Sequence, residues 1–444
     1  MPSELMMGAQ VASCITVPQG TGRVVLCFGF EQSFDAFPSG RGDPTGAEIL
    51  IELLKTKFLP RFYPIIISRQ KTLDYVARKV HTGTYLDKTS LRFGNSGAYN
   101  WLHPDPFEVL KIVGEVEEIA IRYRYYRRLS PSKLRRALIA KVSFWQNLIS
   151  DFEEVIYVNG NVPHTVDDFI AYRICAHLGH PTVCAYRLPI VPEISARLMF
   201  FADPFDQSNP IPLSNISASD MHRRSNDLDA VVAQFAGNGV AVQRDGLMMP
   251  CTGSEGGEGR SRRKSKKLFS LGRRAYRSVL RGHGGLGLGQ SLSALVSYRR
   301  IAKKEIPENF IYFPLHMQPE ASSIPLGGVY GDQELLVRAF AEALPLGLSL
   351  VVKEHPRQIE PERLLFRYSG FYKRICANNN VFLVHHDVST SFLLKRSLAA
   401  VTLTGTTAFE ALAFRKYCFL WGHLRLLVLQ MHWRQTPKEN YAIT

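Results

Sequence analysis

The feature that most constrains this chain is a pattern that occurs twice, in which short apolar runs alternate with longer amphipathic stretches. Such alternation favours parallel sheets wound with helices, so we predict an α/β fold with two doubly wound domains. The predicted strands are 23–29, 64–68, 153–158 and 182–186 in the first half and 309–313, 348–353, 381–384, 399–403 and 417–421 in the second. The predicted helices are 47–57, 107–128, 130–150, 165–178, 331–344, 361–377, 389–397 and 408–414.

The two halves are separated by a segment of different composition. Residues 260–304 contain 14 Arg and Lys and no Asp or Glu, and residues 282–289 include five glycines. The formal net charge of the chain is +15, so 15 − 14 leaves +1 for the rest. We therefore predict an interdomain connector between the two domains. The predicted boundaries are 20–205 for the N-terminal domain, 206–305 for the basic connector, 306–422 for the C-terminal domain and 423–444 for an atypical tail.

Length and cysteine content bound the class of protein. A chain of 444 residues suits two domains, and no apolar run approaches the ~20 residues that a spanning helix needs. The N-terminus lacks a basic region followed by an apolar one, so we do not expect a cleaved signal. The seven cysteines are odd in number and form no CxxC pair. We expect reduced thiols in a cytoplasmic protein, with neither a disulfide framework nor a cysteine zinc site.

The turn after the strand 399–403 is one candidate for binding a phosphate. Gly405 in a strand-to-helix turn lets the backbone approach a ligand, and the following helix start offers N–H groups to an anion. Thr404 and Thr406 add hydroxyl groups, and Glu410 lies one turn into the helix, where its carboxylate could accept from ribose hydroxyls. A plain threonine cap is the alternative interpretation of this turn.

Three further polar clusters follow predicted strands of the same domain. Each could instead be an ordinary turn, cap or surface loop. Parallel strands end at one edge of a sheet, so together the four clusters predict a nucleotide-phosphate site. The clusters are Lys353, Glu354 and His355 before Pro356, then Ser389 and Thr390 after Asp387, and His316, Gln318 and Glu320 after the strand 309–313. Of these, His355 could donate to a phosphate oxygen or protonate it as it leaves.

Other polar residues are weaker candidates. His385, His386 and Asp387 are adjacent, but neighbouring histidines rarely share one metal ion, so we expect no metal site. In the N-terminal half, Glu31 and Asp35 follow the first strand and His164 follows a later one. Any of these could place a carboxylate or an imidazole on the other side of a cleft, or be an ordinary loop residue.

Taken together, the motifs of the C-terminal half resemble those of the capsule polysaccharide biosynthesis protein family. They cover about 310–422 densely, and the N-terminal half agrees only in general pattern. The residues that carry the resemblance are Phe310 to Glu320, Pro325 to Tyr330, Asp332 to Glu334, Val352 to Pro356, Phe371 and Tyr372, Ser389 and Thr390, Thr404 to Thr406, and Glu410 to Leu412.

This resemblance implies a GT-B-like glycosyltransferase with two Rossmann-like domains facing a cleft, the nucleotide-sugar on the C-terminal one and the acceptor on the N-terminal one. Related members add Kdo from CMP-Kdo to a lipid-linked acceptor, and the His-Pro and Ser/Thr motifs also resemble those of sialyltransferases that use CMP donors. Carried over by position, His355 would contact or protonate the donor phosphate. We further predict Glu354, beside it, and Asp35, after the first strand, as catalytic residues. The nucleotide-binding residues are Lys353, His316, Gln318, Glu320, Ser389, Thr390, Thr404, Gly405, Thr406 and Glu410.

We therefore expect a glycosyltransferase that moves a Kdo-like sugar from a CMP donor to a lipid-linked or polysaccharide acceptor. No cofactor or metal is expected beyond the nucleotide-sugar substrate. The connector, Arg260 to Lys304, is expected to bind the anionic inner membrane face, with other capsule assembly proteins as further partners. A non-catalytic capsule assembly or export component is the first alternative. A nucleic-acid-binding protein is the second, disfavoured because the basic residues lie in one glycine-flanked segment with few aromatic residues.

Overall fold

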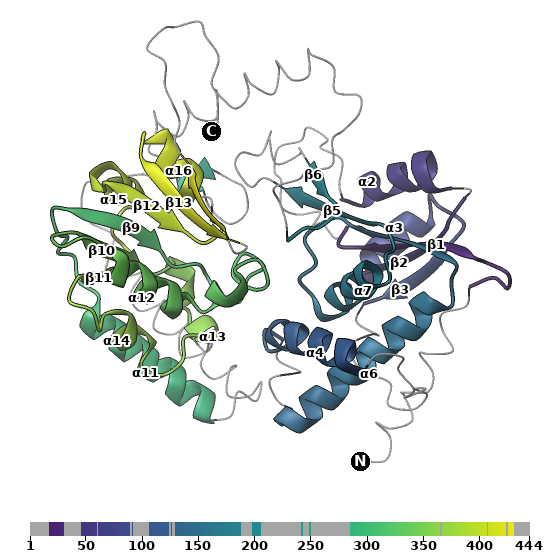
Figure 1. Cartoon of the computed structure of the whole chain (residues 1–444), viewed down its shortest axis with the longest axis horizontal. Helices are drawn as coiled ribbons and strands as arrows, with labels where there is room; N and C mark the ends of the chain where they lie inside the picture. Colours follow the sequence, from purple (N-terminus) through teal and green to yellow (C-terminus); the bar gives the residue numbers. More distant parts are fainter. Residues whose placement is uncertain are drawn as a thin grey trace, which may run out of the picture. The chain divides into compact units, whose positions relative to one another are not determined.

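The computed structural model contains two compact units, Met1–Ile216 and Ser217–Thr444. It describes residues 17–30, 46–59, 61–88, 91, 106–123, 126, 129–187, 198–205, 241–242, 248–249, 285–364, 366–405, 407–422 and 425–429. Each unit has helices on both faces of one mainly parallel sheet (Figure 1). The prediction of an α/β fold with two doubly wound domains is confirmed, whereas the expected cleft between them and the domain boundaries stay predictions.

The sheet of the N-terminal unit has six strands in the order β3-β2-β1-β4-β5-β6. The first five of these, counted from β3, run parallel, and β6 pairs with β5 in the antiparallel sense. The strands are β1 (Arg23–Phe28), β2 (Tyr63–Ser68), β3 (Thr84–Asp87), β4 (Glu154–Asn159), β5 (Thr182–Arg187) and β6 (Leu198–Phe201). The central strands are rich in Val and Ile and are buried on both faces, as a sheet covered by helices requires.

Helices cover both faces of this sheet. They are α2 (Gly46–Leu53), which continues into the π-helical turn Leu54–Phe58, then α3 (Gln70–Ala77), α4 (Pro106–Ala120), α6 (Pro131–Ser150) and α7 (Val166–His177). On one face Leu50, Leu54 and Val76 pack against Val25 and Ile66. The predicted start of α6 is confirmed, with Ser130 as N-cap and Pro131 in the first turn. The helix predicted at 107–128 ends earlier, at Ala120.

The C-terminal sheet repeats the same strand order, β11-β10-β9-β12-β13-β14. Its strands are β9 (Phe310–Pro314), β10 (Ser349–Lys353), β11 (Val381–Val384), β12 (Ala399–Thr402), β13 (Tyr417–Gly422) and β14 (Arg425–Leu429). The segment after Gly422, expected to be an atypical tail, contributes β14, which pairs with β13 in the antiparallel sense. In both units, therefore, an antiparallel strand follows the last parallel one at one edge of the sheet.

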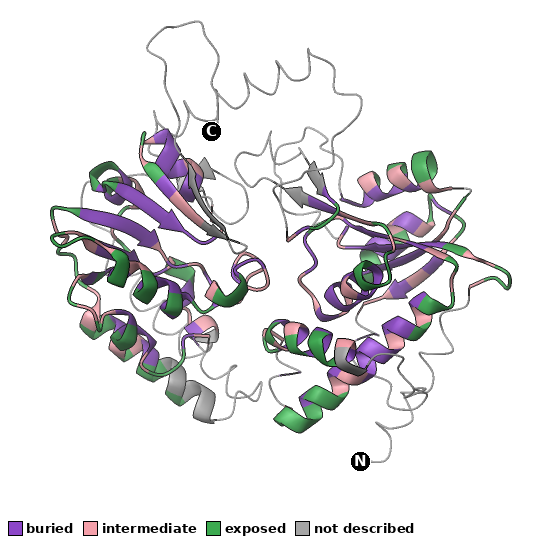
Figure 2. Ribbon diagram, viewed as in Figure 1, coloured by how far each residue is buried: buried purple, intermediate pink, exposed green. Residues whose placement is uncertain are grey.

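The helices of this unit are α11 (Gly285–Ile301), α12 (Gln333–Ala343), α13 (Pro361–Leu364), α14 (Phe371–Ile375), α15 (Thr390–Arg396) and α16 (Thr407–Ala413). Ala294 and Tyr298 of α11 join the same buried cluster as Leu336 and Tyr372. Part of the predicted connector is thus a helix packed on the C-terminal unit, with the face opposite the core exposed (Figure 2). A small hairpin, β7 (Ala241–Val242) and β8 (Met248–Met249), precedes it.

The single helix expected over 361–377 is two short helices. Gly370, between them, has φ 79°, a left-handed conformation that favours glycine and ends a helical run. The break allows the segment between α13 and α14 to send a side chain into the interior, and that side chain is Arg367, which is fully buried.

Candidate functional site

Loops that follow three neighbouring strands meet at the carboxyl edge of the C-terminal sheet. His316 and Gln318 follow β9, Lys353 to His355 end and follow β10, and Gly405 follows β12. β9 and β12 are parallel neighbours, but successive strands are added on one side of β9 up to β11 and on its other side from β12 onward. Ligands of doubly wound folds bind at such a switch point. The predicted polar clusters therefore lie along one edge, centred on β9.

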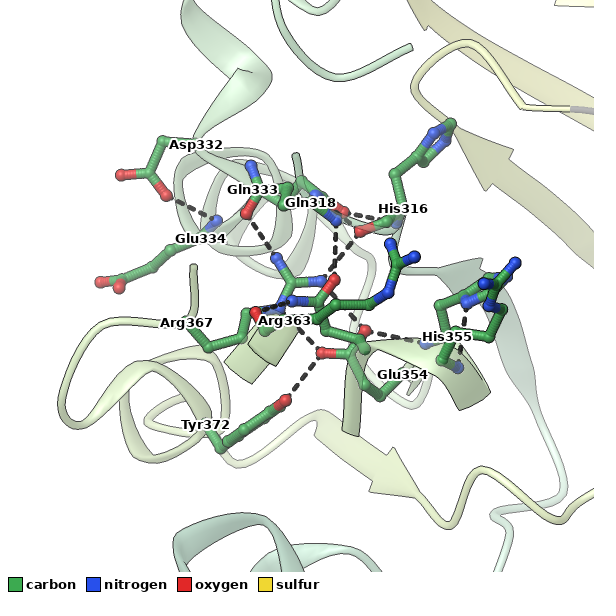
Figure 3. Close-up of polar contacts among 12 residues, drawn as sticks. His316, Gln318, Asp332, Gln333, Glu334, Glu354, His355, Arg363, Arg367 and Tyr372 are labelled. Atoms are coloured by element: carbon green, nitrogen blue, oxygen red, sulfur yellow. Dashed lines mark hydrogen bonds and ion pairs between the residues drawn. The ribbon is translucent and has the colours of Figure 1, made fainter. Parts of the chain in front are cut away.

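Arg367 joins two of these loops through a buried network (Figure 3). Its Nε and Nη2 donate to the two carboxylate oxygens of Glu354, at 2.8 and 3.0 Å. The Nη1 group donates to Gln318 Oε1 at 2.7 Å, and Nη2 also donates to the carbonyl of His316 at 2.9 Å. Tyr372 completes the shell by donating its hydroxyl to Glu354 at 2.8 Å. The loops after β9 and β10 are thereby held in one arrangement.

Glu354 is occupied entirely by these contacts. Its carboxylate is fully buried and also accepts the backbone N–H of His355 at 2.7 Å. The four protein donors and the absence of solvent exposure account for both oxygens of this carboxylate. The geometry gives Glu354 a positioning role toward His355, and the catalytic role predicted for it stays a prediction.

His355 caps the short 3-10 turn Pro356–Ile359. Its Nδ1 accepts the backbone N–H of Arg357 at 3.2 Å. Since Nδ1 is the acceptor, the neutral ring carries its proton on Nε2. The side chain is half-buried at the end of β10. A neutral His355 is thus a hydrogen-bond donor through Nε2, which is the form needed to stabilise a phosphate oxygen.

His316 is held in a different state from His355. Its Nε2 lies 3.0 Å from the hydroxyl of Thr402, which in turn accepts the N–H of Gly405 at 3.2 Å. Burial, together with the nearby His355 and Arg367, lowers the pKa of His316 to about 4. The ring is neutral near pH 7 and links the loop after β9 to the turn after β12.

The packing of His316 and Thr402 explains why residue 405 is a glycine, and this explanation differs from the predicted one. A Cβ at Gly405 would lie 2.7 Å from Thr402 Oγ1 and 3.0 Å from His316 Cε1. We expected glycine at this position so that a ligand could approach the backbone. In the structure, a side chain is excluded by atoms of the protein itself. Thr404, next to it, donates its hydroxyl to the carbonyl of Ser322 at 2.6 Å.

The remaining predicted residues have mixed placements. Lys353 is buried and donates to Thr390 Oγ1 at 2.9 Å, so these two meet between β10 and α15. Ser389 is exposed and its Oγ accepts the N–H of Phe392 at 3.4 Å as a helix cap, the alternative left open for it. The Glu320 carboxylate accepts from the Ser322 hydroxyl at 3.5 Å. Thr406, Glu31 and Asp35 lie outside the described residues.

Glu410 is buried on α16, one turn after its start. Burial raises the pKa of its carboxyl to about 7, and the positive charge of Lys353 lowers it in part. Near neutral pH this residue exchanges between a neutral acid and a carboxylate. The nucleotide-binding role expected for Glu410 stays a prediction.

Several residues that organise the edge were not anticipated. Gln333 exchanges hydrogen bonds with the backbone of His316, at 2.6 Å to its N–H and 3.1 Å from its carbonyl. Gln358 accepts the N–H of Gln318 at 2.7 Å. Gln333, Gln358 and Arg367 do not directly follow a predicted strand, whereas the predicted polar clusters all do. In the sequence, only the position of Arg367 near the helix-breaking Gly370 could have indicated this role.

The adjacent His385, His386 and Asp387 follow β11 at the same edge, with possible ligand atoms within 4.8 Å of one another. The Nδ1 atoms of both histidines already have protein partners. Tyr298 Oη lies 3.1 Å from His386 Nδ1, and His385 Nδ1 accepts the N–H of Asp387 at 3.3 Å. These contacts form a local hydrogen-bonded turn after β11, and Tyr298 joins this turn to α11.

The two sheets and the polar edge define the class of protein, an α/β chain with two Rossmann-like domains, as in GT-B-like proteins. The family follows from the second domain. Residues 303–424 match the capsule polysaccharide biosynthesis protein family, and the resemblance drawn from the motifs of this segment is confirmed. The match supports a role in capsule polysaccharide biosynthesis. No curated protein matches the chain.

Solved structures resemble the chain only distantly. KpsC of Thermosulfurimonas dismutans, a beta Kdo 2,7 transferase, is 12% identical over 67% of this chain and 77% of its own, with a TM-score of 0.28. UDP-GlcNAc 2-epimerase of Methanocaldococcus jannaschii is 10% identical over 89% and 82%, with a TM-score of 0.23. A glycosyltransferase of Rickettsia africae is 12% identical over 89% and 78%, with a TM-score of 0.20. These scores carry no functional argument, and the class rests on the strand order of the two sheets.

Replacing Glu354 tests the buried network. Glu354→Gln leaves the Arg367 charge buried without its counter-charge, and we expect a loss of about 3–5 kcal/mol in the free energy of unfolding. Scanning calorimetry measures the change. Arg357→Gln, which removes an exposed ion pair at 3.9 Å to Glu360, is the matched control and is expected to cost less than about 1 kcal/mol. Equal effects of the two substitutions would contradict the assigned role.

The raised pKa of Glu410 predicts a pH dependence of stability. Between about pH 4.5 and 7 the folded protein keeps a proton on Glu410 that the unfolded chain has lost. Stability therefore falls as pH rises through this window, and the full loss is present above it. Glu410→Gln should weaken this dependence and raise the melting temperature relative to the parent at pH 8. The exposed Glu342→Gln on α12 is the control, and an unchanged pH slope in Glu410→Gln would refute the assignment.

Proposed function

We propose that this chain is a glycosyltransferase of capsule or surface polysaccharide biosynthesis. It transfers an acidic, Kdo-like sugar from a CMP donor to a lipid-linked or polysaccharide acceptor. The observation that carries the proposal is the polar carboxyl edge around β9, β10 and β12, inside the segment that matches the capsule polysaccharide biosynthesis protein family. The choice of CMP rests on the His-Pro and Ser/Thr motifs.

The chemistry follows from the groups at this edge. Glycosyl transfer breaks the bond between the anomeric carbon and a phosphate oxygen, so negative charge develops on the departing phosphate. His355, with its proton on Nε2, would donate a hydrogen bond to that oxygen, and Lys353 would add a positive charge from the end of β10. Glu354 and Arg367 keep both loops in place, so little reorganisation is needed when the charge appears.

Nucleotide binding is the experiment that tests this function. CMP should raise the melting temperature of the full chain, because a ligand bound only by the folded state stabilises it. His355→Ala should lower the transfer rate by about 10²-fold or more, the usual effect of losing such a donor. His81→Ala, at an exposed position of the N-terminal unit, is the control. Stabilisation by UDP in place of CMP would change the donor class, and no response to any nucleotide would favour the export component.

Peripheral binding to an anionic membrane is the second part of the proposal. None of the described helices is long and apolar enough to cross a bilayer. On α11, Leu292 and Val296 are 61% and 47% exposed, and Arg299 and Arg300 continue the same face toward Lys303. Apolar side chains beside cations match a lipid surface with anionic headgroups. The ten basic residues of 260–281 lie outside the described residues and add to the charge.

Vesicle co-sedimentation tests this membrane contact. We expect binding to vesicles that contain phosphatidylglycerol, weaker binding to phosphatidylcholine alone, and loss at high salt. Replacing Arg299, Arg300 and Lys303 by Gln should weaken binding about 10²-fold, at about 1 kcal/mol per charge. The same change at Lys133, Arg135 and Arg136, exposed on α6, is the control. Binding that ignores lipid charge, or an equal loss in both variants, would argue against α11 as the contact.

A further inference from the structure

The amino edge of the C-terminal sheet, opposite the polar carboxyl edge, carries a group of cations and apolar side chains. The last turns of α15 and α16 and the starts of β12 and β13 meet there. Ala399 of β12 pairs with Tyr417 of β13, so the preceding residues, Leu398 and Lys416, are neighbours. We call this surface the amino-edge patch. Its members are Phe392, Lys395, Arg396, Leu398, Lys416 and Tyr417.

The amino-edge patch is open to solvent. Phe392, Leu398 and Tyr417 are 44%, 51% and 47% exposed. The two cations of α15 are also exposed, and Lys416 is half-buried. At the neighbouring start of β9, the exposed Glu308 bounds the patch. Single exposed apolar residues are ordinary, whereas a group of them beside charged side chains is typical of an interaction surface.

The positive charge of the patch is not balanced by acidic side chains on the same elements. Residues 388–422 contain four basic residues and a single acid, Glu410, which is buried. Lys395, Arg396 and Lys416 form no ion pair with any carboxylate in the part of the chain that the structure describes. The partial negative charge at the C-terminal end of α15 stabilises the two cations of its last turn without an acidic partner. The patch therefore offers positive charge to an anionic ligand.

Two of these cations lie over aromatic rings. Lys395 Nζ is 5.6 Å from the ring centre of Phe414, and Arg396 Cζ is 5.6 Å from that of Phe392. The negative ring face attracts the cation, so ring and charge stay together. A ring covered in this way enters the apolar interior of a bilayer only together with its cation, which is costly. The patch therefore fits a hydrated polyanion better than a lipid surface.

We propose that the amino-edge patch binds an anionic glycan, with sugar carboxylates at Lys395, Arg396 and Lys416 and the apolar face of a sugar packed on Tyr417. The inference rests on the proposed function, because transfer of an acidic sugar gives a product glycan that carries a carboxylate. The strands of this sheet have four to six residues, so its two edges are on the order of 15 Å apart. An oligosaccharide spans that distance, and the patch would hold the product glycan between transfers.

The charged part of the patch is tested with polysialic acid, a carboxylate polymer, and the full chain. We expect the labelled polymer to bind in fluorescence anisotropy and to be released at high salt, and neutral dextran to bind roughly tenfold more weakly or not at all. Replacing the three cations of the patch by Gln should weaken polysialic acid by about tenfold or more. The control removes the same net charge at Lys133, Arg135 and Arg136, exposed on α6, and should leave most of the binding intact. The basic residues of 260–281 are unchanged in both variants, so their contribution cancels.

The aromatic part of the patch is tested with Tyr417→Thr. The β-branched Thr suits the start of β13, so the strand is kept while the ring is lost. Binding of polysialic acid should weaken roughly threefold, with the melting temperature close to that of the parent. Parent-like binding by this variant would exclude Tyr417 from the contact.

Three outcomes overturn the glycan site. The first is parent-like binding of polysialic acid by the variant without the patch cations, and the second is an equal loss in the α6 control. The third is weaker binding to phosphatidylglycerol vesicles in the patch variant with polysialic acid unaffected, which assigns the patch to lipid. A parent protein that responds to no nucleotide overturns the proposed function instead, and the polymer measurements still decide the patch.

Discussion

The arrangement of the C-terminal edge depends on one buried ion pair, Arg367 with Glu354. A charge pair without solvent is a poor source of net stability, because desolvation offsets most of the Coulomb attraction. The Arg367–Glu354 pair instead fixes the geometry of this edge. Four hydrogen-bonding groups converge on the pair from the loops after β9 and β10 and from α14, so these segments cannot shift independently. His355 is placed by its own backbone bond to Glu354, and the group aimed at a phosphate is thereby positioned from the interior.

Three histidines show how local hydrogen bonds select different chemistry from one residue type. His355 accepts on Nδ1 and can donate from Nε2, whereas His164 donates from Nδ1 and can accept on Nε2. His316 has Thr402 at its Nε2, and its lowered pKa keeps it neutral near pH 7. Because the two sheets share one strand order, the first two histidines each lie at the carboxyl edge of a sheet.

Much of the fold could be predicted because apolar periodicity reports directly on burial. The runs at 23–29, 64–68 and 381–384 correspond to β1, β2 and β11 within a residue or two. Short edge strands such as β3 and β14 were missed, since a half-covered strand of four or five residues has a weak pattern. The helix expected over 361–377 is interrupted at Gly370, where the left-handed backbone turns the chain. This turn allows the side chain of Arg367 to be buried. Part of the expected connector became α11, because Ala294 and Tyr298 find a core that no local pattern reveals.

The sequence by itself determined the two doubly wound domains, the basic segment between them, and which polar residues follow strands, because each of these depends on local spacing alone. Only the tertiary structure decided what those residues do. Glu354 became the partner of a buried arginine thirteen positions away, Gly405 proved to be crowded by His316, and Ser389 became a helix cap. Such roles come from contacts between segments distant in the chain, and a side chain's tautomer, burial and charge partner exist only once those segments have packed together.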